Sequence, residues 1–200
     1  MRLLPYGPDA LLVELPDASL VVALREAALE LPGVLEAVAG AQTVLVELDL
    51  SLTSLAAVRA GLQSVSLETR EPARAHHVEI PVYYDGADLD GVARLCGLEP
   101  AEVVRRHSAA TYTVRFCGFA PGFAYLDGLD PALHVARHAS PRSTVPAGSV
   151  AIAGEFAGVY PRQSPGGWQL LGRTDLELWN VSATPPALLT PGTTVRFVRS

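Results

Sequence analysis

The sequence predicts an α+β protein, in which a small split βαβ-type α/β domain at residues 1–75 precedes a closed β-barrel at residues 76–200. In the first domain, short β-rich runs alternate with stretches of helical periodicity. A polar stretch containing a proline, residues 68–75 (ETREPARA), then has the composition of a linker. From residue 111 onward, short β-rich runs are separated by Gly and Pro, which favours a barrel over βαβ units.

The N-terminal domain is expected to have the element order β-α-β-β-α. Its expected elements are a strand at 10–15, a helix at 17–31, a hairpin of strands at 34–39 and 43–48, and a helix at 51–65. Asp17 or Ser19 is expected to cap the first helix, and Ser51 or Thr53 the second. The β-rich run 77–84 either completes this sheet or opens the next domain.

The C-terminal domain is expected to begin with two short helices and continue as β-structure. The helices are expected at 88–96, ending at Gly97, and at 101–108, with Pro100 near the start. The expected strands lie at 112–116, 149–153, 158–160, 168–172, 177–179 and 194–198. Two short helices around a Gly turn resemble a helix-turn-helix, but no basic recognition face accompanies them.

The charge balance argues against several classes of partner. The chain carries 15 basic and 21 acidic residues, for a formal net charge of -6. Nucleic acids and anionic membranes both require a basic surface, so we expect neither as a partner. Every basic residue is Arg, and the absence of Lys excludes a Lys nucleophile or a P-loop Lys. Residues 76–200 hold 10 Arg against 11 acidic residues, so an anionic ligand meets least repulsion there.

Cysteine usage and the N-terminus favour a cytoplasmic protein. The chain has two cysteines, Cys96 and Cys117, and neither lies in a CxxC motif. The N-terminus resembles the start of a strand, and no window resembles a signal peptide or a membrane span. We also expect no metal site, because His134 and His138 share a helical spacing without a carboxylate to complete a ligand set.

Residues 118–129 (GFAPGFAYLDGL) combine three glycines with three aromatic residues. Aromatic side chains beside glycines form an apolar wall where backbone can approach a ligand. A barrel corner that needs glycine for its backbone angles explains the same composition equally well, and the residues alone leave both interpretations open.

Three arginines, Arg142, Arg162 and Arg173, lie at loop–strand junctions in the second domain. They either converge on one anion or act singly as surface residues and loop braces. Ser164 precedes a Pro-Gly-Gly turn whose N–H groups can form an anion-binding nest. Neither serine of interest, Ser149 or Ser164, lies in a G-x-S-x-G nucleophile elbow.

His107 ends the second of the two short helices. It is either a residue that interacts with the helix dipole or a general acid or base. The sequence pattern does not separate these two roles.

Three blocks of this sequence closely resemble signature blocks of one family. They are GFAPGFAYLDGL (118–129), PRSTVPAGSVAIAG (141–154) and YPRQSPGGWQLLGRT (160–174). The family is that of the B subunit of 5-oxoprolinase, also described as allophanate hydrolase subunit 1 or as the Kip-type sporulation-kinase inhibitors. The resemblance covers nearly the whole chain and implies an N-terminal α/β domain followed by a cyclophilin-like barrel.

The resemblance implies a B-type subunit of an ATP-dependent 5-oxoprolinase, which opens 5-oxoproline (pyroglutamate) to glutamate. Its partners would be a C-type subunit, also cyclophilin-like, and an A-type subunit, and the chain alone would be inactive. ATP would be used by the complex without being clearly bound by this chain. Two alternatives follow from other relatives, namely an inhibitor that binds a sensor histidine kinase and a carboxyltransferase component of a urea- or allophanate-utilising system.

Under the first implication, the candidate residues fall into two groups. The catalytic candidates are His107 as a proton shuttle, and Arg142 or Arg173 as the group that holds the lactam carboxylate. The substrate-binding candidates are Phe119, Phe123, Tyr125, Ser149, Ser164, Gly166, Gly167 and Trp168.

Overall fold

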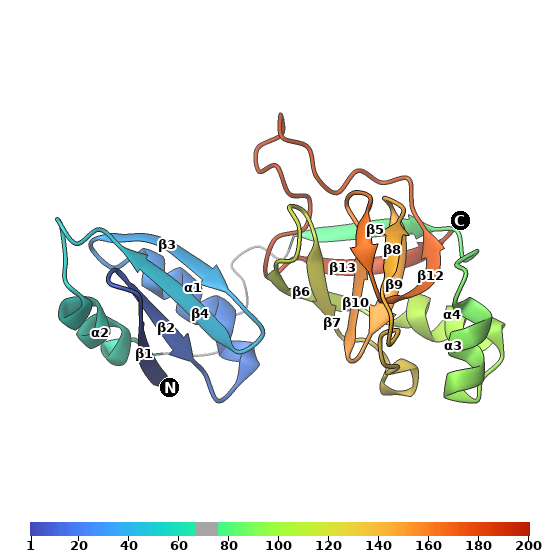
Figure 1. The fold of residues 1–200 in the computed structure, drawn as a ribbon, viewed down its shortest axis with the longest axis horizontal. Helices are drawn as coiled ribbons and strands as arrows, with labels where there is room; N and C mark the ends of the chain where they lie inside the picture. Colours follow the sequence, from blue (N-terminus) through green and yellow to red (C-terminus); the bar gives the residue numbers. More distant parts are fainter. Residues whose placement is uncertain (67–75) are drawn as a thin grey trace. The chain divides into compact units, whose positions relative to one another are not determined.

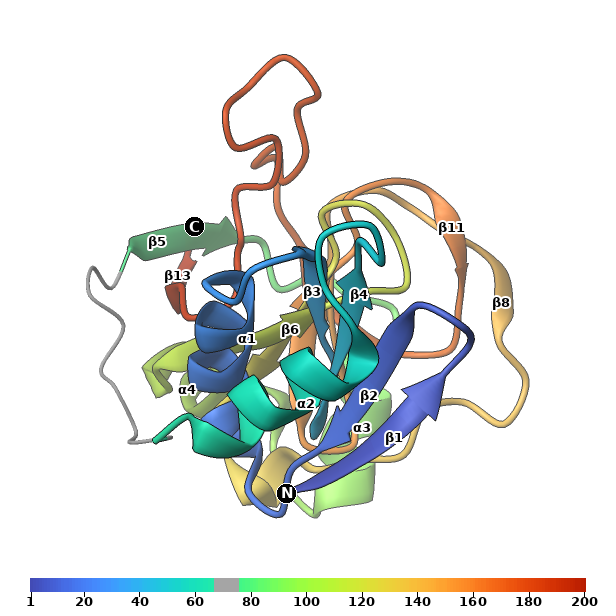
Figure 2. The same ribbon diagram turned by 90° about the vertical axis from the view of Figure 1, so that its left-hand side faces the viewer.

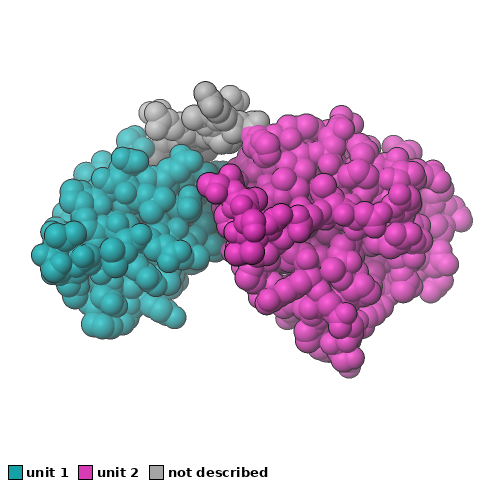
Figure 3. Space-filling model, turned by 90° about the horizontal axis from the view of Figure 1, so that it is seen from above, with its two compact units in different colours: residues 1–74 teal, residues 75–200 magenta. Residues whose placement is uncertain are grey.

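The computed structural model describes residues 1–66 and 76–200. The chain divides into two compact units, Met1–Arg74 and Ala75–Ser200 (Figure 3). The expected linker at 68–75 lies outside the described residues. The exact boundary between the two predicted domains, 1–75 and 76–200, therefore stays a prediction.

The first unit is a four-stranded antiparallel sheet in the order β1-β2-β4-β3. Its strands are β1 (Arg2–Tyr6), β2 (Ala10–Glu14), β3 (Val34–Ala39) and β4 (Thr43–Leu48), and its helices are α1 (Val21–Leu29) and α2 (Leu55–Ser64). Both helices pack on the sheet, and they lie on one face of it (Figures 1 and 2). Helix α1 joins β2 to β3, and β4 lies between these two strands, which confirms the split βαβ arrangement.

Strand β1 was not predicted as a separate element, although the N-terminus was expected to resemble the start of a strand. It pairs with β2 along its whole length, including Leu4 opposite Leu12, and occupies the edge of the sheet. Pro5 is tolerated there because an edge strand has one side free of ladder hydrogen bonds. The run from His77, which was the other candidate for completing this sheet, instead opens the second unit as β5.

The cap of α2 differs from the expected one. Ser54 accepts a hydrogen bond from the Ala57 N–H at 3.2 Å and begins the helix. Ser51 is not available for that role, because its N–H and hydroxyl both bond the Asp49 carboxylate in a local turn. At the first helix the expected cap Asp17 does accept the Ser19 N–H, at the start of a 3₁₀ turn, η1 (Ala18–Leu20), that leads into α1.

The second unit is a nearly closed barrel built on a seven-stranded sheet in the order β12-β9-β10-β7-β6-β13-β5. Its strands are β5 (His77–Val82), β6 (Tyr112–Cys117), β7 (Ala124–Asp127), β9 (Ser149–Ala153), β10 (Phe156–Val159), β12 (Gln169–Arg173) and β13 (Thr194–Arg199). A bridge between Tyr83 and Arg173, with two backbone hydrogen bonds of 2.9 Å, links the first and last strands. This seam confirms the predicted barrel.

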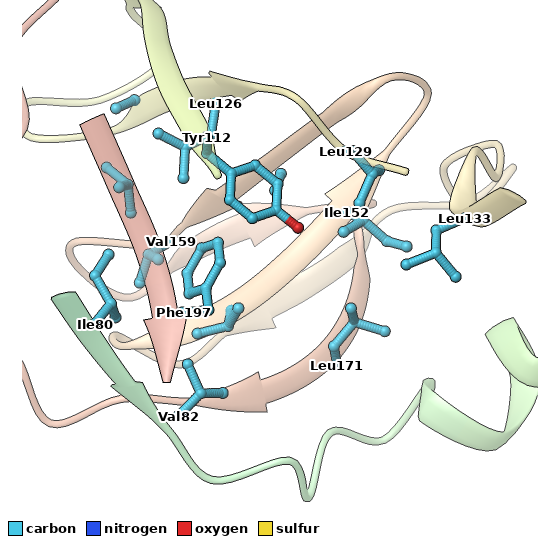
Figure 4. Close-up of a cluster of buried hydrophobic side chains, with 14 of the residues drawn as sticks. Ile80, Val82, Tyr112, Leu126, Leu129, Leu133, Ile152, Val159, Leu171 and Phe197 are labelled. Carbon is cyan, nitrogen blue, oxygen red and sulfur yellow. The ribbon is translucent and has the colours of Figure 1, made fainter. Parts of the chain in front are cut away.

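The barrel interior is apolar and continuous. Side chains from many strands, including Ile80, Tyr112, Ile152 and Phe197, point into it (Figure 4). Helices α3 (Leu89–Cys96) and α4 (Pro100–Ala109) pack against β12 and β13 respectively. Both helices were expected, and α3 ends as predicted at Gly97, which adopts the left-handed conformation.

Several β-elements differ from expectation in the Gly/Pro-rich region. The run 177–179 is not a strand, because it makes only an isolated bridge between Trp179 and Ala187. Strand β7 was not predicted, nor were β8 (Arg142–Val145) and β11 (Ser164–Gly166), which form a separate two-stranded sheet. Among the described residues, no helix has both the length and the apolar character to span a membrane.

Candidate functional site

An aromatic pocket of about 290 Å³ opens on the barrel unit. Its lining residues are Phe119, Phe123, Tyr125, Arg137, Pro141, Tyr160, Pro165, Gly166, Gly167 and Trp168. Six of the eight predicted substrate-binding residues line it, and they come from segments as far apart as 119–125 and 166–168. Residues that were grouped under the family resemblance are thus brought together in space.

The pocket walls are held by edge-to-face ring contacts. Phe123 is fully buried and lies 5.1–5.4 Å, centroid to centroid, from the rings of Tyr125, Tyr160 and Trp168. Such T-shaped contacts stabilise a fixed ring geometry beyond simple burial. The pocket is therefore preformed, with rigid walls.

Phe119 forms the outer part of the same pocket. It has φ of 68°, which is the left-handed region that non-glycine residues rarely adopt, and its side chain is 60% exposed. Backbone strain of this kind persists only where the surrounding structure enforces it, and it is found most often at active sites and ligand-binding sites. Phe119 thus presents an aromatic face to solvent at the pocket, where a ligand or a partner chain can contact it.

Arg137 supplies positive charge at the aromatic pocket. Arg137 and Tyr125 line the same pocket, and while burial raises the pKa of Tyr125, the charge of Arg137 opposes that rise. Within residues 1–66 and 76–200, no carboxylate forms an ion pair with Arg137. Arg137 was not among the residues predicted from the sequence, although it lies between the two histidines that were considered as metal ligands.

The segment that carries Arg137 is fixed on both sides. The Gln169 side chain donates to the Ala136 carbonyl at 3.0 Å, and the His138 N–H donates to the Gly167 carbonyl at 2.7 Å. Further along, Arg142 pairs with Gly166 in the β8–β11 ladder. The backbone at Arg137 is consequently ordered before any ligand arrives.

Asp88, which precedes α3, holds the chain that follows Arg137 through its contacts with His138 and Arg142. Its carboxylate accepts hydrogen bonds from Arg142 at 2.6 Å and from the Leu170 N–H at 2.7 Å, and His138 Nε2 lies 3.3 Å away. Burial opposes ionisation of Asp88, but these hydrogen bonds and the charge of Arg142 outweigh it and hold the pKa below its usual value. We call Asp88, His138 and Arg142 the Asp88 cluster.

A second, more open hollow of about 640 Å³ lies beside the Asp88 cluster. Asp88, Asp90, Arg94, His138 and Gln169 contribute its polar lining. The neighbours Arg137 and His138 line different hollows, as do Trp168 and Gln169. The segments 137–138 and 168–169 therefore form a wall shared by the two hollows.

His107 lies in the barrel core, away from both hollows. It has no exposed surface and packs against Phe197, with ring centroids 4.4 Å apart, while its Nδ1 lies 2.8 Å from the Tyr84 hydroxyl. Burial lowers its pKa to about 3, so the ring is neutral at physiological pH. This environment suits a structural residue, whereas the proton shuttle proposed from the sequence needs contact with substrate.

The two arginines proposed as carboxylate binders have intramolecular carboxylate partners. Arg142 is bound to Asp88. Arg173 lies at the barrel seam, where its guanidinium bonds Asp85 at 2.9 Å and lies over the Tyr83 ring. The arginines thus bind different carboxylates and do not converge on one anion, and Arg162 lines neither hollow.

The two proposed serines are placed differently from the pocket residues. Ser149 is buried and donates its hydroxyl to the Pro146 carbonyl at 2.8 Å, as part of a turn. Ser164 lies on β11, and its buried hydroxyl has no hydrogen-bond partner among the described residues. Neither serine lines the aromatic pocket. No group of three or more His, Cys, Asp or Glu residues in the described parts of the chain could hold a metal ion.

Gly166 packs against Tyr160 in the pocket wall and leaves no room for a side chain. A Cβ at Gly166 would collide with the Tyr160 hydroxyl, whereas one at Gly167 would have no neighbour closer than 3.5 Å. We expect Gly166→Ala to displace Tyr160 and destabilise the second unit by about 1–3 kcal/mol, through overpacking. Gly167→Ala is the matched control and should cost less than about 1 kcal/mol. Urea unfolding measures both, and equal losses would contradict the steric explanation.

Comparison with known proteins places this chain in the class of carboxyltransferase-type domains. The sequence profile of the carboxyltransferase domain, subdomains C and D, matches residues 1–189. The crystal structure of the protein TTHA0988 superimposes with a TM-score of 0.84 at 37% identity, covering 96% of this chain and 40% of that one. Urea amidolyase of Kluyveromyces lactis shares the fold, with a TM-score of 0.80 at 20% identity over 99% of this chain and 15% of that chain.

The particular family follows from two curated relatives. The B subunit of 5-oxoprolinase from Escherichia coli O157:H7 is 43% identical over 180 residues, which cover 88% of this chain and 82% of that protein. The protein of the same name from Bacillus subtilis is 49% identical over 125 residues, or 61% of this chain and 52% of that protein. The chain belongs to the family of 5-oxoprolinase B subunits.

Proposed function

We propose that this protein is the B-type subunit of an ATP-dependent 5-oxoprolinase, which opens the lactam of 5-oxoproline to give glutamate. The observation that carries this proposal is the 43% identity to a 5-oxoprolinase B subunit over 88% of the chain. The three sequence blocks that carry the resemblance contribute every lining residue of the aromatic pocket except Arg137, and they also contribute Arg142 of the Asp88 cluster. The family likeness is thus concentrated around the aromatic pocket.

The aromatic pocket is proposed as this subunit's part of the substrate site. Ligand pockets are typically apolar and aromatic, with a few polar groups that fix orientation. Phe119, Phe123, Tyr125 and Trp168 supply the apolar walls here, and Gly166 and Gly167 let backbone approach the ligand. A flat five-membered lactam ring can lie against such walls.

The site is proposed to be shared with partner subunits. The chain offers no nucleophile elbow, and the one histidine proposed as a proton shuttle is buried in the core. Chemistry on the lactam therefore needs groups from elsewhere, and we assign these to C-type and A-type subunits. The exposed ring of Phe119 is placed where a partner can cover the pocket.

ATP is proposed to bind on a partner subunit. The chain contains no Lys and therefore no P-loop Lys, and neither hollow presents a cluster of unpaired cations suited to a triphosphate. The residues present do not fit the nucleotide, so we derive no step through ATP on this chain. The proposal places the complex in the cytoplasm, which contains the ATP that it consumes.

Co-expression of this chain with C- and A-type subunits tests the proposal. We expect a tagged form of the chain to retain both partners during purification, and the purified assembly to release glutamate from 5-oxoproline only when ATP is present. A control assembly with an established B-type subunit fixes the assay conditions. No retention and no glutamate release, under conditions where the control assembly works, would refute the proposal.

A further inference from the structure

We infer that Arg137 is the residue that binds the carboxylate of a small, flat, anionic ring ligand in the aromatic pocket. The inference deepens the proposed function and rests on it for the identity of the ligand, 5-oxoproline. It assigns to Arg137 the role that was expected of Arg142 or Arg173. Three features of the structure support the assignment.

The first feature is the unused charge. Arg142 and Arg173 are hydrogen-bonded to Asp88 and Asp85, so each of them already has a carboxylate partner. Arg137 lines the pocket and forms no ion pair with any residue that the structure describes. A guanidinium with free N–H groups binds a carboxylate in a two-pronged fashion, which fixes both the position and the orientation of the ligand.

The second feature is the ordered backbone around this arginine. The carbonyl before Arg137 and the N–H after it are both hydrogen-bonded to the segment that carries Gly167 and Gln169. The Asp88 cluster then holds the next part of the chain. A ligand therefore does not have to order this loop, and this preorganisation strengthens binding.

The third feature is the shape of the remaining pocket. Tyr125, Trp168 and Phe123 form rigid aromatic walls beside Arg137. A planar lactam can stack on a ring while its carboxylate reaches the guanidinium. A neutral analogue of the same shape would keep the stacking and lose the charge contact, and this difference provides the test.

Discrimination between 5-oxoproline and its neutral amide, 5-oxoprolinamide, tests the inference in the three-subunit complex. We expect the wild-type complex to favour the acid in kcat/KM, and Arg137→Gln to lower kcat/KM for the acid about 10- to 100-fold, mainly through KM. The amide should be affected much less. Arg162→Gln, which removes an exposed arginine that lines neither hollow, is the matched control and should keep the wild-type preference.

The outcomes separate this inference from the proposed function. An active complex in which Arg137→Gln keeps the preference for the acid would overturn the role of Arg137 and leave the function standing. If the wild-type complex shows no turnover, the function fails, and binding to this chain is measured instead by its tryptophan fluorescence in a Trp179→Phe background, in which Trp168 of the pocket is the one remaining tryptophan. A 5-oxoproline-dependent change that Arg137→Gln abolishes and Arg162→Gln keeps would support the inference. No change in the wild type, or equal changes in both variants, would overturn it.

Discussion

Replacing Asp88 with Ala is expected to destabilise the second unit by about 3 kcal/mol, near the lower end for breaking a buried ion pair. Asp88 is buried, and its removal leaves the Arg142 guanidinium without its carboxylate and the Leu170 N–H without its acceptor. Arg142 is 31% exposed, so solvent screens part of the cost. Both tryptophans of the chain, Trp168 and Trp179, lie in this unit, and their fluorescence during urea unfolding reports its stability directly.

Two further variants show whether the lost charge pair is the cause. In the double variant Asp88→Ala with Arg142→Met, no uncompensated charge remains, so part of the stability should return. Asp85→Ala breaks the exposed pair with Arg173, in which both side chains are more than half exposed, and should cost less than about 1 kcal/mol. A double variant no more stable than Asp88→Ala would contradict the electrostatic explanation.

Acid is expected to destabilise the second unit through His107. The pKa of His107 is about 3 in the folded protein because the ring is buried, whereas an unfolded histidine has a pKa near 6.5. Between these values the unfolded chain binds a proton that the folded chain cannot, so the free energy of unfolding falls as the pH falls. The slope inside this window is about 1.4 kcal/mol per pH unit.

His107→Gln isolates this effect. Glutamine cannot titrate, yet its amide can still bond the Tyr84 hydroxyl. We expect urea unfolding of the variant to lack the His107 slope between about pH 5.5 and 4.5, although its stability at neutral pH is lower. His77→Gln, which changes an exposed histidine, should keep the wild-type slope. The Asp88 contribution is lost only at lower pH, below about 4, because its pKa is depressed. Identical slopes in the wild type and His107→Gln would contradict the buried, neutral histidine.

Much of the fold could be predicted from local sequence patterns. The stop at Gly97 and the Pro at residue 100 helped to locate α3 and α4, and two β-rich runs split at residues 40–41 located the hairpin of β3 and β4. The N-terminus was expected to be the start of a strand, but β1 was not separated from β2, because Pro5 and the turn at Gly7 interrupt the strand signal. Strands β8 and β11 are only four and three residues long, and their pairing depends on tertiary contacts.

The candidate site was predicted only in part, because some of its features depend on contacts between residues far apart in the sequence. Aromatic residues near glycines are visible in the sequence, and six of the eight proposed residues line one pocket. Which arginine remains unpaired depends on where the carboxylates lie, and Asp88 is 54 residues from Arg142 in the sequence. His107 illustrates the same limit. Its position at a helix end left a dipole interaction and a general acid or base open, and its burial depends on the packing of α4 against β13.

The most direct test of the central claim is the rate of ATP-dependent glutamate release from 5-oxoproline by A- and C-type subunits, measured with and without this chain. If the chain supplies part of the lactam site, the mixture without it should be inactive, and adding the wild-type chain should restore turnover. Adding the Arg137→Gln chain should restore it only at high 5-oxoproline concentration. Equal turnover with and without the chain would contradict the claim that this protein forms part of the active assembly.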